Sequence, residues 1–192
     1  MIRNVRWITV LFVLSLPLLA ESNTWEIDPN HTASQFSIRH LGISTVRGLF
    51  EKTSGTVTYD PADPSKTTID VSIDAATVNT RVERRDNDLR SPNFFDVAKY
   101  PTITFKSKHT EAAGSGKLKI TGDLTMHGVT KEVVLDVEGP TEPMNDPMGS
   151  IRMGASATTS INRKDFGVNG APALAGEQVQ ITLDVELKRP KQ

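Results

Sequence analysis

Four histidines are the residues of this 192-residue chain best suited to binding a metal ion. They are His31, His40, His109 and His127, and no two of them have the close spacing of a metal site on one helix or hairpin. The chain has no cysteine, which excludes a thiolate metal site, a cysteine nucleophile and a disulfide framework. A metal site could still assemble in three dimensions, but we expect no metal and no cofactor.

A hydrolytic site needs a nucleophile, a base and an orienting group. The chain has no G-x-S-x-G motif, in which a serine nucleophile sits on a sharp turn. Asp60 and Asp63 form a close acidic pair, but they belong to a polar turn where solvent does not favour a raised pKa. We therefore predict that the protein is not an enzyme.

Charged side chains are densest in the segments 84–86 and 88–90. One interpretation is a solvated helix face, with intrahelical pairs worth ~0.2–0.5 kcal/mol each. The alternative is that Arg85 and Asp86 flank the opening of a pocket and hold a polar head group. Arg163, close in sequence to Phe166, could act in the same way from the opposite side. Both interpretations remain open at this stage.

The segment Thr80 to Pro101 carries these charges and is the one part of the folded chain without the alternation of a strand. Thr80 and Glu83 have the spacing of a capping box, which predicts a helix start at Thr80. Ser91-Pro92 has the pattern of a second helix start, and the rings of Phe94-Phe95 follow it. A helical insertion with paired aromatic rings suggests a plug over a cavity. A crossover whose rings only fill the core is the alternative.

Polar and apolar residues alternate through the rest of the chain, which predicts about eight to nine strands with one apolar face each. Such strands can close into an antiparallel barrel or stack as a two-sheet sandwich. The inward residues Gly48, Gly122 and Ala155 are too small to fill the centre of a barrel. A barrel of this composition should therefore keep a cavity with apolar walls and an apolar ligand. His40 ends an inward-facing strand and would lie at the mouth of such a barrel.

Residues 1–20 have the pattern of a secretory signal peptide. Arg3 and Arg6 precede an apolar run from Ile8 to Ala20, which is shorter than the roughly 20 residues of a spanning helix. We predict cleavage after Ala20 or Ser22, and a periplasmic or secreted protein with no stable membrane insertion. An uncleaved anchor is the alternative. The net charge of −1 shows no basic excess, so nucleic acid is not an expected partner.

Several sequence blocks, in order over about 24–188, resemble the YceI-like family of bacterial lipid- and polyisoprenoid-binding proteins. The blocks are W-x-I-D (25–28) followed by His31, F-S-I-R-H-L-G (36–42), V-R-G-L-F (46–50), R-D-N-D-L-R-S-P-N-F-F-D (85–96), K-Y-P-T-I-T-F (99–105), G-D-L-T-M-H-G-V-T-K (122–131) and N-R-K-D-F-G (162–167). At Asp88 relatives often carry a histidine, so a histidine role cannot be carried over to that position.

The resemblance implies an all-β fold, an eight-stranded antiparallel lipocalin-like barrel with one short helical insertion. It also implies non-catalytic binding, transport or sequestration of a long apolar amphiphile, such as a polyisoprenoid, an isoprenoid quinone or its precursor. The alternatives are an enzyme acting on a lipid or quinone precursor, and an envelope stress protein with an unused pocket. A homodimer remains open.

Alternation and resemblance together predict the residues of the ligand pocket. The tail pocket would be lined by Phe36, Ile38, Val46, Phe50, Ile69, Val71, Ile73, Phe105, Leu124, Met126 and Met153. The helical insertion would close it with Leu89, Phe94 and Phe95. The polar head group would lie near His40, Asp86 and Arg163, and Phe166 is a further residue of the pocket.

Overall fold

The computed structural model describes residues 23–190, and the predicted signal peptide with its cleavage site lies outside the described residues. The strands are β1 (Thr24–Ile27), β2 (Ala33–His40), β3 (Ser44–Phe50), β4 (Thr53–Thr58), β5 (Thr68–Asp74), β6 (Val78–Asn79), β7 (Thr102–Ala112), β8 (Lys117–Met126), β9 (Val129–Glu138), β10 (Met144–Asn145), β11 (Ser150–Asn162) and β12 (Ala175–Pro190). The described residues contain one α-helix, α1 (Glu83–Arg90), and three short 3₁₀ helices, η1 (Pro64–Lys66), η2 (Ala75–Thr77) and η3 (Arg163–Phe166).

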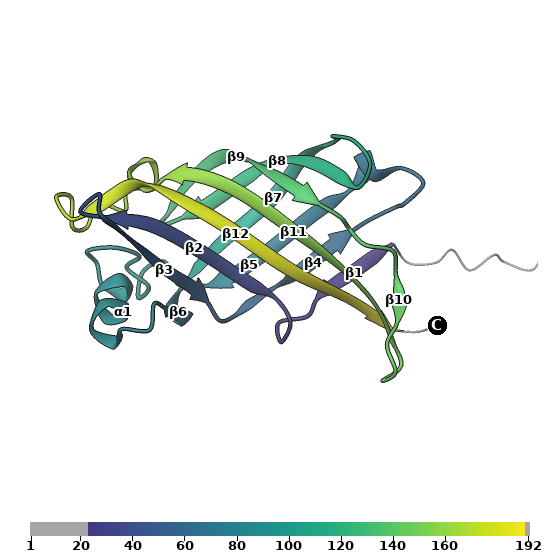
Figure 1. The fold of residues 1–192 in the computed structure, drawn as a ribbon, viewed down its shortest axis with the longest axis horizontal. Coiled ribbons are helices and arrows are strands. Elements are labelled where there is room, and N and C mark those ends of the chain that lie inside the picture. The colour runs from purple at the N-terminus through teal and green to yellow at the C-terminus, as the bar shows by residue number, and fades with distance from the viewer. Residues whose placement is uncertain (1–22, 191–192) are drawn as a thin grey trace, which may run out of the picture.

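Eight of these strands close into an antiparallel barrel (Figure 1). Around the ring the order is β11, β9, β8, β7, β5, β4, β1 and β12, and β12 pairs back with β11. The predicted eight-stranded barrel with one short helical insertion is therefore confirmed, and the sandwich alternative is wrong. Closure leaves no free edge along most of the ring, which is the physical advantage of a barrel over an open sheet.

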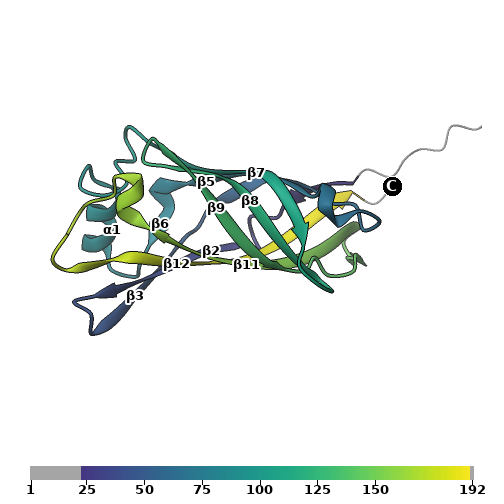
Figure 2. The same ribbon diagram turned by 90° about the horizontal axis from the view of Figure 1, so that it is seen from above.

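The structure has more strands than the predicted eight to nine because a bend divides β3 from β4 and because β6 and β10 are additional strands of two residues each. The chain turns after Ile27 and resumes as β2, so that β12 pairs first with β2 and near its end with β1. A second bend at Glu51-Lys52 separates β3 from β4. β2 pairs with β3 and β1 pairs with β4, so the bent ribbon stays continuous. The described part of the chain is elongated, with α1 at one end and the start of β1 and the end of β12 at the other (Figures 1 and 2).

Tight turns follow the sequence closely. His127 and Gly128 connect β8 to β9 with φ values of 52° and 74°, as the mirror-image two-residue hairpin turn requires. The predicted hairpin at His127-Gly128 is therefore confirmed. The ring of His127 packs on Tyr100 with ring centroids 4.8 Å apart, which joins this turn to the end of the helical insertion.

The helix does not begin with the predicted capping box. Val82 is the N-cap of α1, and no side chain caps that end. The Thr80 hydroxyl instead donates to Asp86 at 2.5 Å. The second predicted helix start, at Ser91-Pro92, begins a series of turns in which the Ser91 carbonyl and hydroxyl accept backbone N–H groups of Asn93, Phe94 and Asp96. The spacing of Thr80 and Glu83 correctly predicted that a helix starts close to residue 80. The Thr80 hydroxyl does not cap it, because that hydroxyl binds the buried carboxylate of Asp86.

Two inward glycines have a different purpose from the one predicted. A Cβ at Gly48 would lie 2.5 Å from Cζ of Phe36, and a Cβ at Gly122 would lie 2.5 Å from Cζ of Phe105. These glycines make room for the aromatic rings of neighbouring strands and leave no extra space for a ligand. The cavity described below comes from the barrel as a whole.

Candidate ligand cavity

A cavity of about 380 Å³ runs inside the barrel. Its wall is made of the inward-facing side chains of the strands, because each strand alternates between the interior and the solvent. Most of the predicted pocket residues line it: Phe36, Ile38, His40, Val46, Phe50, Ile69, Val71, Ile73, Leu89, Phe94, Phe95, Phe105, Leu124, Met126 and Arg163. The structure thus brings these side chains together around one space.

Further apolar residues that were not singled out from the sequence complete the wall. They include Val57, Ile103, Leu118, Ile120, Val133, Leu135, Val137, Ile161, Val179, Ile181, Leu183 and Val185. The signal for many of them was present, because the stretch 179–187 alternates without a break. A molecule inside the barrel would therefore meet hydrocarbon along almost its whole length, which favours an apolar ligand by the hydrophobic effect.

Three aromatic rings that contact one another line the cavity near α1. The rings of Phe36 and Phe50 have centroids 5.7 Å apart, and those of Phe50 and Phe95 have centroids 5.5 Å apart in an edge-to-face arrangement. Phe95 comes from the helical insertion, whereas Phe50 belongs to β3. Phe94 packs beneath the loop at Gly170, where a Cβ would lie 2.6 Å from its ring. The insertion therefore forms part of the cavity wall at this end.

At the opposite end of the cavity, a second cluster of buried residues forms the floor. Trp25, Ile27, Met153 and Leu187 pack together, and each is at most 5 % exposed. The guanidinium of Arg189 stacks over the Trp25 ring with Cζ 4.5 Å from the ring centroid. Met153 faces inward as predicted, but it does not line the cavity. It lies in this cluster, beyond the end of the ligand space.

Ionisable side chains line the cavity near α1, among them His40, Arg85 and Asp88. Arg85 is held by Thr80, through bonds of 2.7 Å to the hydroxyl and 2.9 Å to the carbonyl. Asp88 is exposed and accepts a bond of 3.2 Å from the Asn93 amide. Among residues 23–190, no side chain forms a hydrogen bond or ion pair with the His40 ring. The ring nitrogens of His40 are therefore available to bind a ligand.

Arg163 lies at the cavity but is not available to a head group. It is 3 % exposed, and burial lowers the pKa of its guanidinium. Four of its five N–H donors bind backbone carbonyls, two in the loop that precedes β12 and two in the first residues of β12. The acceptors are Val168 O and Gly176 O at 2.7 Å, Gly170 O at 2.8 Å and Ala175 O at 3.1 Å. This side chain fixes the shape of the loop.

Asp86 and Phe166 do not line the cavity either. The Asp86 carboxylate is buried and accepts bonds from the backbone N–H and the hydroxyl of Thr80, at 2.8 Å and 2.5 Å. It thus anchors α1 to the segment before it. Phe166 is 2 % exposed and packs in the main core where η3 contacts β9. Asp86, predicted near the head group, and Phe166, predicted in the pocket, therefore both lie outside the cavity lining and have structural contacts instead.

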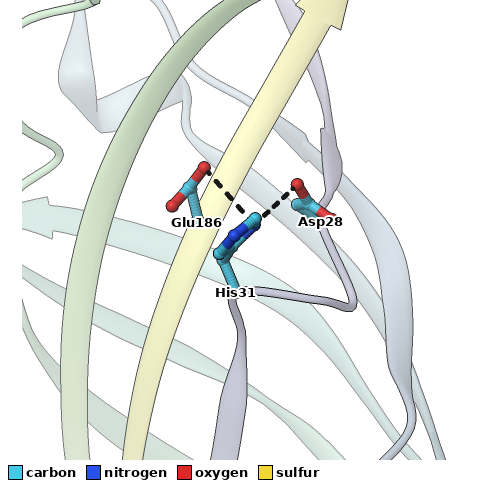
Figure 3. Close-up of side chains that lie close together, drawn as sticks. All are labelled: Asp28, His31 and Glu186. Carbon is cyan, nitrogen blue, oxygen red and sulfur yellow. Dashed lines mark hydrogen bonds and ion pairs between the residues drawn. The ribbon is translucent and has the colours of Figure 1, made fainter. Parts of the chain in front are cut away.

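A cluster of ionisable groups that the sequence did not reveal lies near the bend between β1 and β2 (Figure 3). Asp28, His31 and Glu186 have potential ligand atoms within 4.8 Å of one another. Arg152 already donates Nη1 to Oδ2 of Asp28 at 2.6 Å and to Oε1 of Glu186. Lys188 Nζ lies 3.5 Å from the other oxygen of Asp28. Since cationic side chains already balance these carboxylates, the cluster is an ion-pair network.

The same network lowers the pKa of two carboxyl groups, those of Asp28 and Asp146. The Arg152 and His31 side chains, which bind Asp28, hold the pKa of that carboxyl well below its usual range. Hydrogen bonds from the backbone of Met148 and from Arg152 lower the pKa of Asp146 to about 2. Both carboxylates are therefore charged under ordinary conditions. No residue of this network lines the cavity. Ile27 and Leu187, which are next in sequence to Asp28 and Glu186, do line it.

The chain is similar in sequence and in structure to proteins of one family. The YceI-like domain family matches residues 25–187. A UPF0312 protein of Vibrio cholerae is 38% identical over 160 residues, which cover 81% of this chain and 83% of the relative. The crystal structure of a Campylobacter jejuni YCEI protein is 35% identical with a TM-score of 0.68, covering 80% of this chain and 90% of that one.

A more distant structure shares the fold. It is a polyisoprenoid binding domain from Saccharophagus degradans that is implicated in plant cell wall breakdown. The TM-score is 0.64 at 17% identity, covering 88% of this chain and 100% of that one. Within residues 23–190, no helix is both long and apolar enough to cross a membrane.

Proposed function

The chain belongs to the YceI-like family, and from this premise we propose that it binds a long apolar chain molecule inside the barrel and carries or sequesters it unchanged. The observation that carries the proposal is the continuous apolar wall of the 380 Å³ cavity. Small-molecule sites have volumes of roughly 300–1,000 Å³, with apolar walls and a few polar groups. The cavity fits that description.

Hydrophobic burial is sufficient to hold such a ligand. Burying ~400 Å² of apolar surface contributes on the order of 10 kcal/mol at ~25 cal/mol/Å², before the costs of association. No covalent chemistry is required. The polyisoprenoid binding domain with the same fold makes an isoprenoid chain the first ligand class to test.

We place the polar end of the ligand at the α1 end of the barrel. His40, Arg85 and Asp88 line the cavity there, whereas the other end is closed by the buried cluster around Trp25. An isoprenoid quinone, its precursor or a polyprenol would satisfy both ends. A catalytic role on such a molecule is disfavoured, because the cavity wall offers few groups that could act as acid, base or nucleophile.

We further propose that the protein acts in the periplasm or outside the cell. The support is the basic and apolar pattern of residues 1–20. No cofactor beyond the bound lipid is proposed.

Native mass spectrometry of the protein purified from its own host tests the binding function. We expect a stoichiometric adduct that organic extraction releases as an isoprenoid lipid. The extracted protein should then take up a polyprenol but not a polar sugar phosphate of similar mass. If the extracted, folded protein takes up no apolar chain molecule, the proposal is wrong. Conversion of the added lipid into a new product would favour the enzyme alternative.

A further inference from the structure

Exposed apolar side chains border the mouth of the cavity at the α1 end. Leu41 and Ile43 lie in the turn between β2 and β3 and are 52% and 80% exposed. Leu174, in the loop before β12, is 49% exposed and also lines the cavity. The backbone N–H of Leu41 donates to the carbonyl of Leu174 at 2.8 Å, so the two loops form one surface. We refer to Leu41, Ile43 and Leu174 as the mouth tip.

The mouth tip lies at an extreme end of the molecule. The turn between β2 and β3 and the loop before β12 both project at the same end of the barrel as α1 (Figures 1 and 2). A flat surface could therefore contact the tip without a clash with the barrel wall.

The tip is held in place by internal hydrogen bonds. Arg39 donates to the carbonyl of Gly42 at 2.6 Å and to the hydroxyl of Thr45 at 2.9 Å. The backbone N–H of Ile43 donates to the carbonyl of His40 at 3.1 Å. Leu41 has a φ of 52°, a conformation that is uncommon for a side-chain-bearing residue. A leucine and an isoleucine are thus presented to solvent by an ordered turn, although a polar residue would suit such a turn better.

The charges around the tip are basic. Residues 33–50, which include β2 and β3, contain Arg39 and Arg47 and no aspartate or glutamate. The loop at 167–176 contains no charged residue. The segment 81–90 adds four arginines and three acidic residues, of which Asp86 is buried. An apolar tip within a basic surround is the pattern by which a protein engages an anionic lipid surface.

The opposite end of the barrel provides a contrast within the same chain. Met144 and Met148 are exposed there, at 63% and 91%. The loop that carries them, residues 139–149, contains Glu142 and Asp146 and no lysine or arginine. Exposed apolar side chains are therefore found at both ends, but the loop at the opposite end carries only acidic residues of its own, and its Asp146 is paired with Arg152 of the neighbouring strand.

We propose that the mouth tip docks on the surface of a bilayer that contains anionic lipid, with Ile43 and Leu41 at the boundary between head groups and acyl chains. Docking would direct the cavity mouth at the membrane, so that an apolar chain could pass between bilayer and barrel without crossing water. The inference rests on the proposed lipid-binding function. Binding would be peripheral and reversible, because few apolar side chains are involved.

Vesicle co-sedimentation tests the docking, with protein purified from its host and vesicles of phosphatidylcholine alone or mixed with phosphatidylglycerol. We expect the wild type to sediment with the mixed vesicles, and less so in high salt because exposed charges are screened. Ile43→Asp should reduce sedimentation by about fivefold or more, since it removes apolar surface and adds a negative charge. The matched control is Met148→Asp at the opposite end, which should bind vesicles like the wild type.

The readouts separate docking from ligand binding, because Ile43 does not line the cavity. Ile43→Asp should keep the ligand content that native mass spectrometry measures, while it slows the uptake of a polyprenol from vesicles. Docking that persists in a protein unable to bind any apolar chain would contradict the proposed function and leave the docking surface intact. The docking proposal is wrong if the wild type does not bind mixed vesicles, or if Ile43→Asp and Met148→Asp bind them equally. It is also wrong if Ile43→Asp abolishes a dimer that sedimentation velocity detects in the wild type, because the tip would then be a contact between copies.

Discussion

Arg152 and Asp28 lie 2.6 Å apart, measured from Nη1 to Oδ2, and join β11 to the bend between β1 and β2. The same guanidinium donates Nε to Asp146 at 2.6 Å, in the segment after β10. The Asp28 side chain is 3% exposed, whereas that of Arg152 is 23% exposed. One arginine therefore holds three segments together beside the floor of the cavity.

Replacing this arginine should destabilise the barrel. Arg152→Met leaves the buried Asp28 carboxylate with only His31, Lys188 and the Asn30 N–H as partners. We expect a loss of about 2–3 kcal/mol in the free energy of unfolding, because a buried charge that loses its main partner is costly. Urea unfolding at neutral pH measures it. Lys117→Met is the control, since the pair of Lys117 with Glu138 is exposed and screened by solvent, so its loss should change stability little.

The network also predicts how stability depends on pH. Asp28 and Asp146 both have a lower pKa in the folded state than the ordinary value of 3.8, and that of Asp146 is about 2. A lowered pKa stabilises the fold above the ordinary value, and the stabilisation is lost as the pH falls toward the folded pKa. We expect wild-type stability to drop between about pH 4 and about pH 2, and to drop less steeply in Arg152→Met. Parallel acid profiles for the two proteins would contradict this account.

Gly48 lies beneath the ring of Phe36, which lines the cavity. Gly48→Ala places a Cβ 2.5 Å from that ring and 2.8 Å from Cγ2 of Thr80, so the ring must move into the cavity. We expect a destabilisation of about 1–3 kcal/mol and a lower ligand capacity, measured by thermal unfolding and native mass spectrometry. Gly154→Ala is a matched control, because the nearest atom to its Cβ would be 3.7 Å away. If both variants behave alike, the ring does not depend on the glycine.

The barrel was largely predictable because each strand exposes one face to solvent and buries the other, which makes polar and apolar residues alternate along the sequence. Alternation marks the inward side even in the long strand β12, where Val179, Ile181 and Leu183 line the cavity. The contacts that hold the bend between β1 and β2 were not predictable. They centre on Asp28, whose side chain binds Arg152 and whose backbone N–H donates to the carbonyl of Glu186, and both partners lie far along the chain. Sequence patterns report polarity, and they do not report which distant residue a polar group will meet.

The same limit explains the errors at the site. Asp86 and Arg163 were assigned to a head group because charged residues near a pocket suggest ligand contacts. In the structure, Asp86 binds Thr80, and Arg163 binds four backbone carbonyls. Met153 had the correct inward phase but lies past the end of the cavity. The alternation of polar and apolar residues predicts whether a side chain faces the barrel interior. It does not predict the position of that side chain along the barrel axis.

Val71 lies in the cavity wall on β5 and should be essential for holding an apolar chain. Val71→Asp puts a carboxylate among hydrocarbon side chains, and we expect loss of lipid uptake, measured with a fluorescent polyprenol. The control is Thr68→Asp on the same strand, whose side chain is exposed. Circular dichroism should show that both variants fold. A folded Val71→Asp protein with normal uptake would mean that the ligand does not occupy this cavity.

Phe95 connects the helical insertion to the barrel through its edge-to-face contact with Phe50 at 5.5 Å. Phe95→Ala removes a contact worth about 0.5–1.5 kcal/mol beyond its buried area. If the ligand leaves past α1, its dissociation should become roughly 2–10 times faster, since changes in affinity appear mainly in the dissociation rate. Stopped-flow transfer of the fluorescent polyprenol to acceptor vesicles measures that rate. Val82→Ala, on the exposed side of the same insertion, should leave it unchanged. An unchanged rate in Phe95→Ala would locate the exit elsewhere, for example where β9 and β11 stop pairing beyond Thr158.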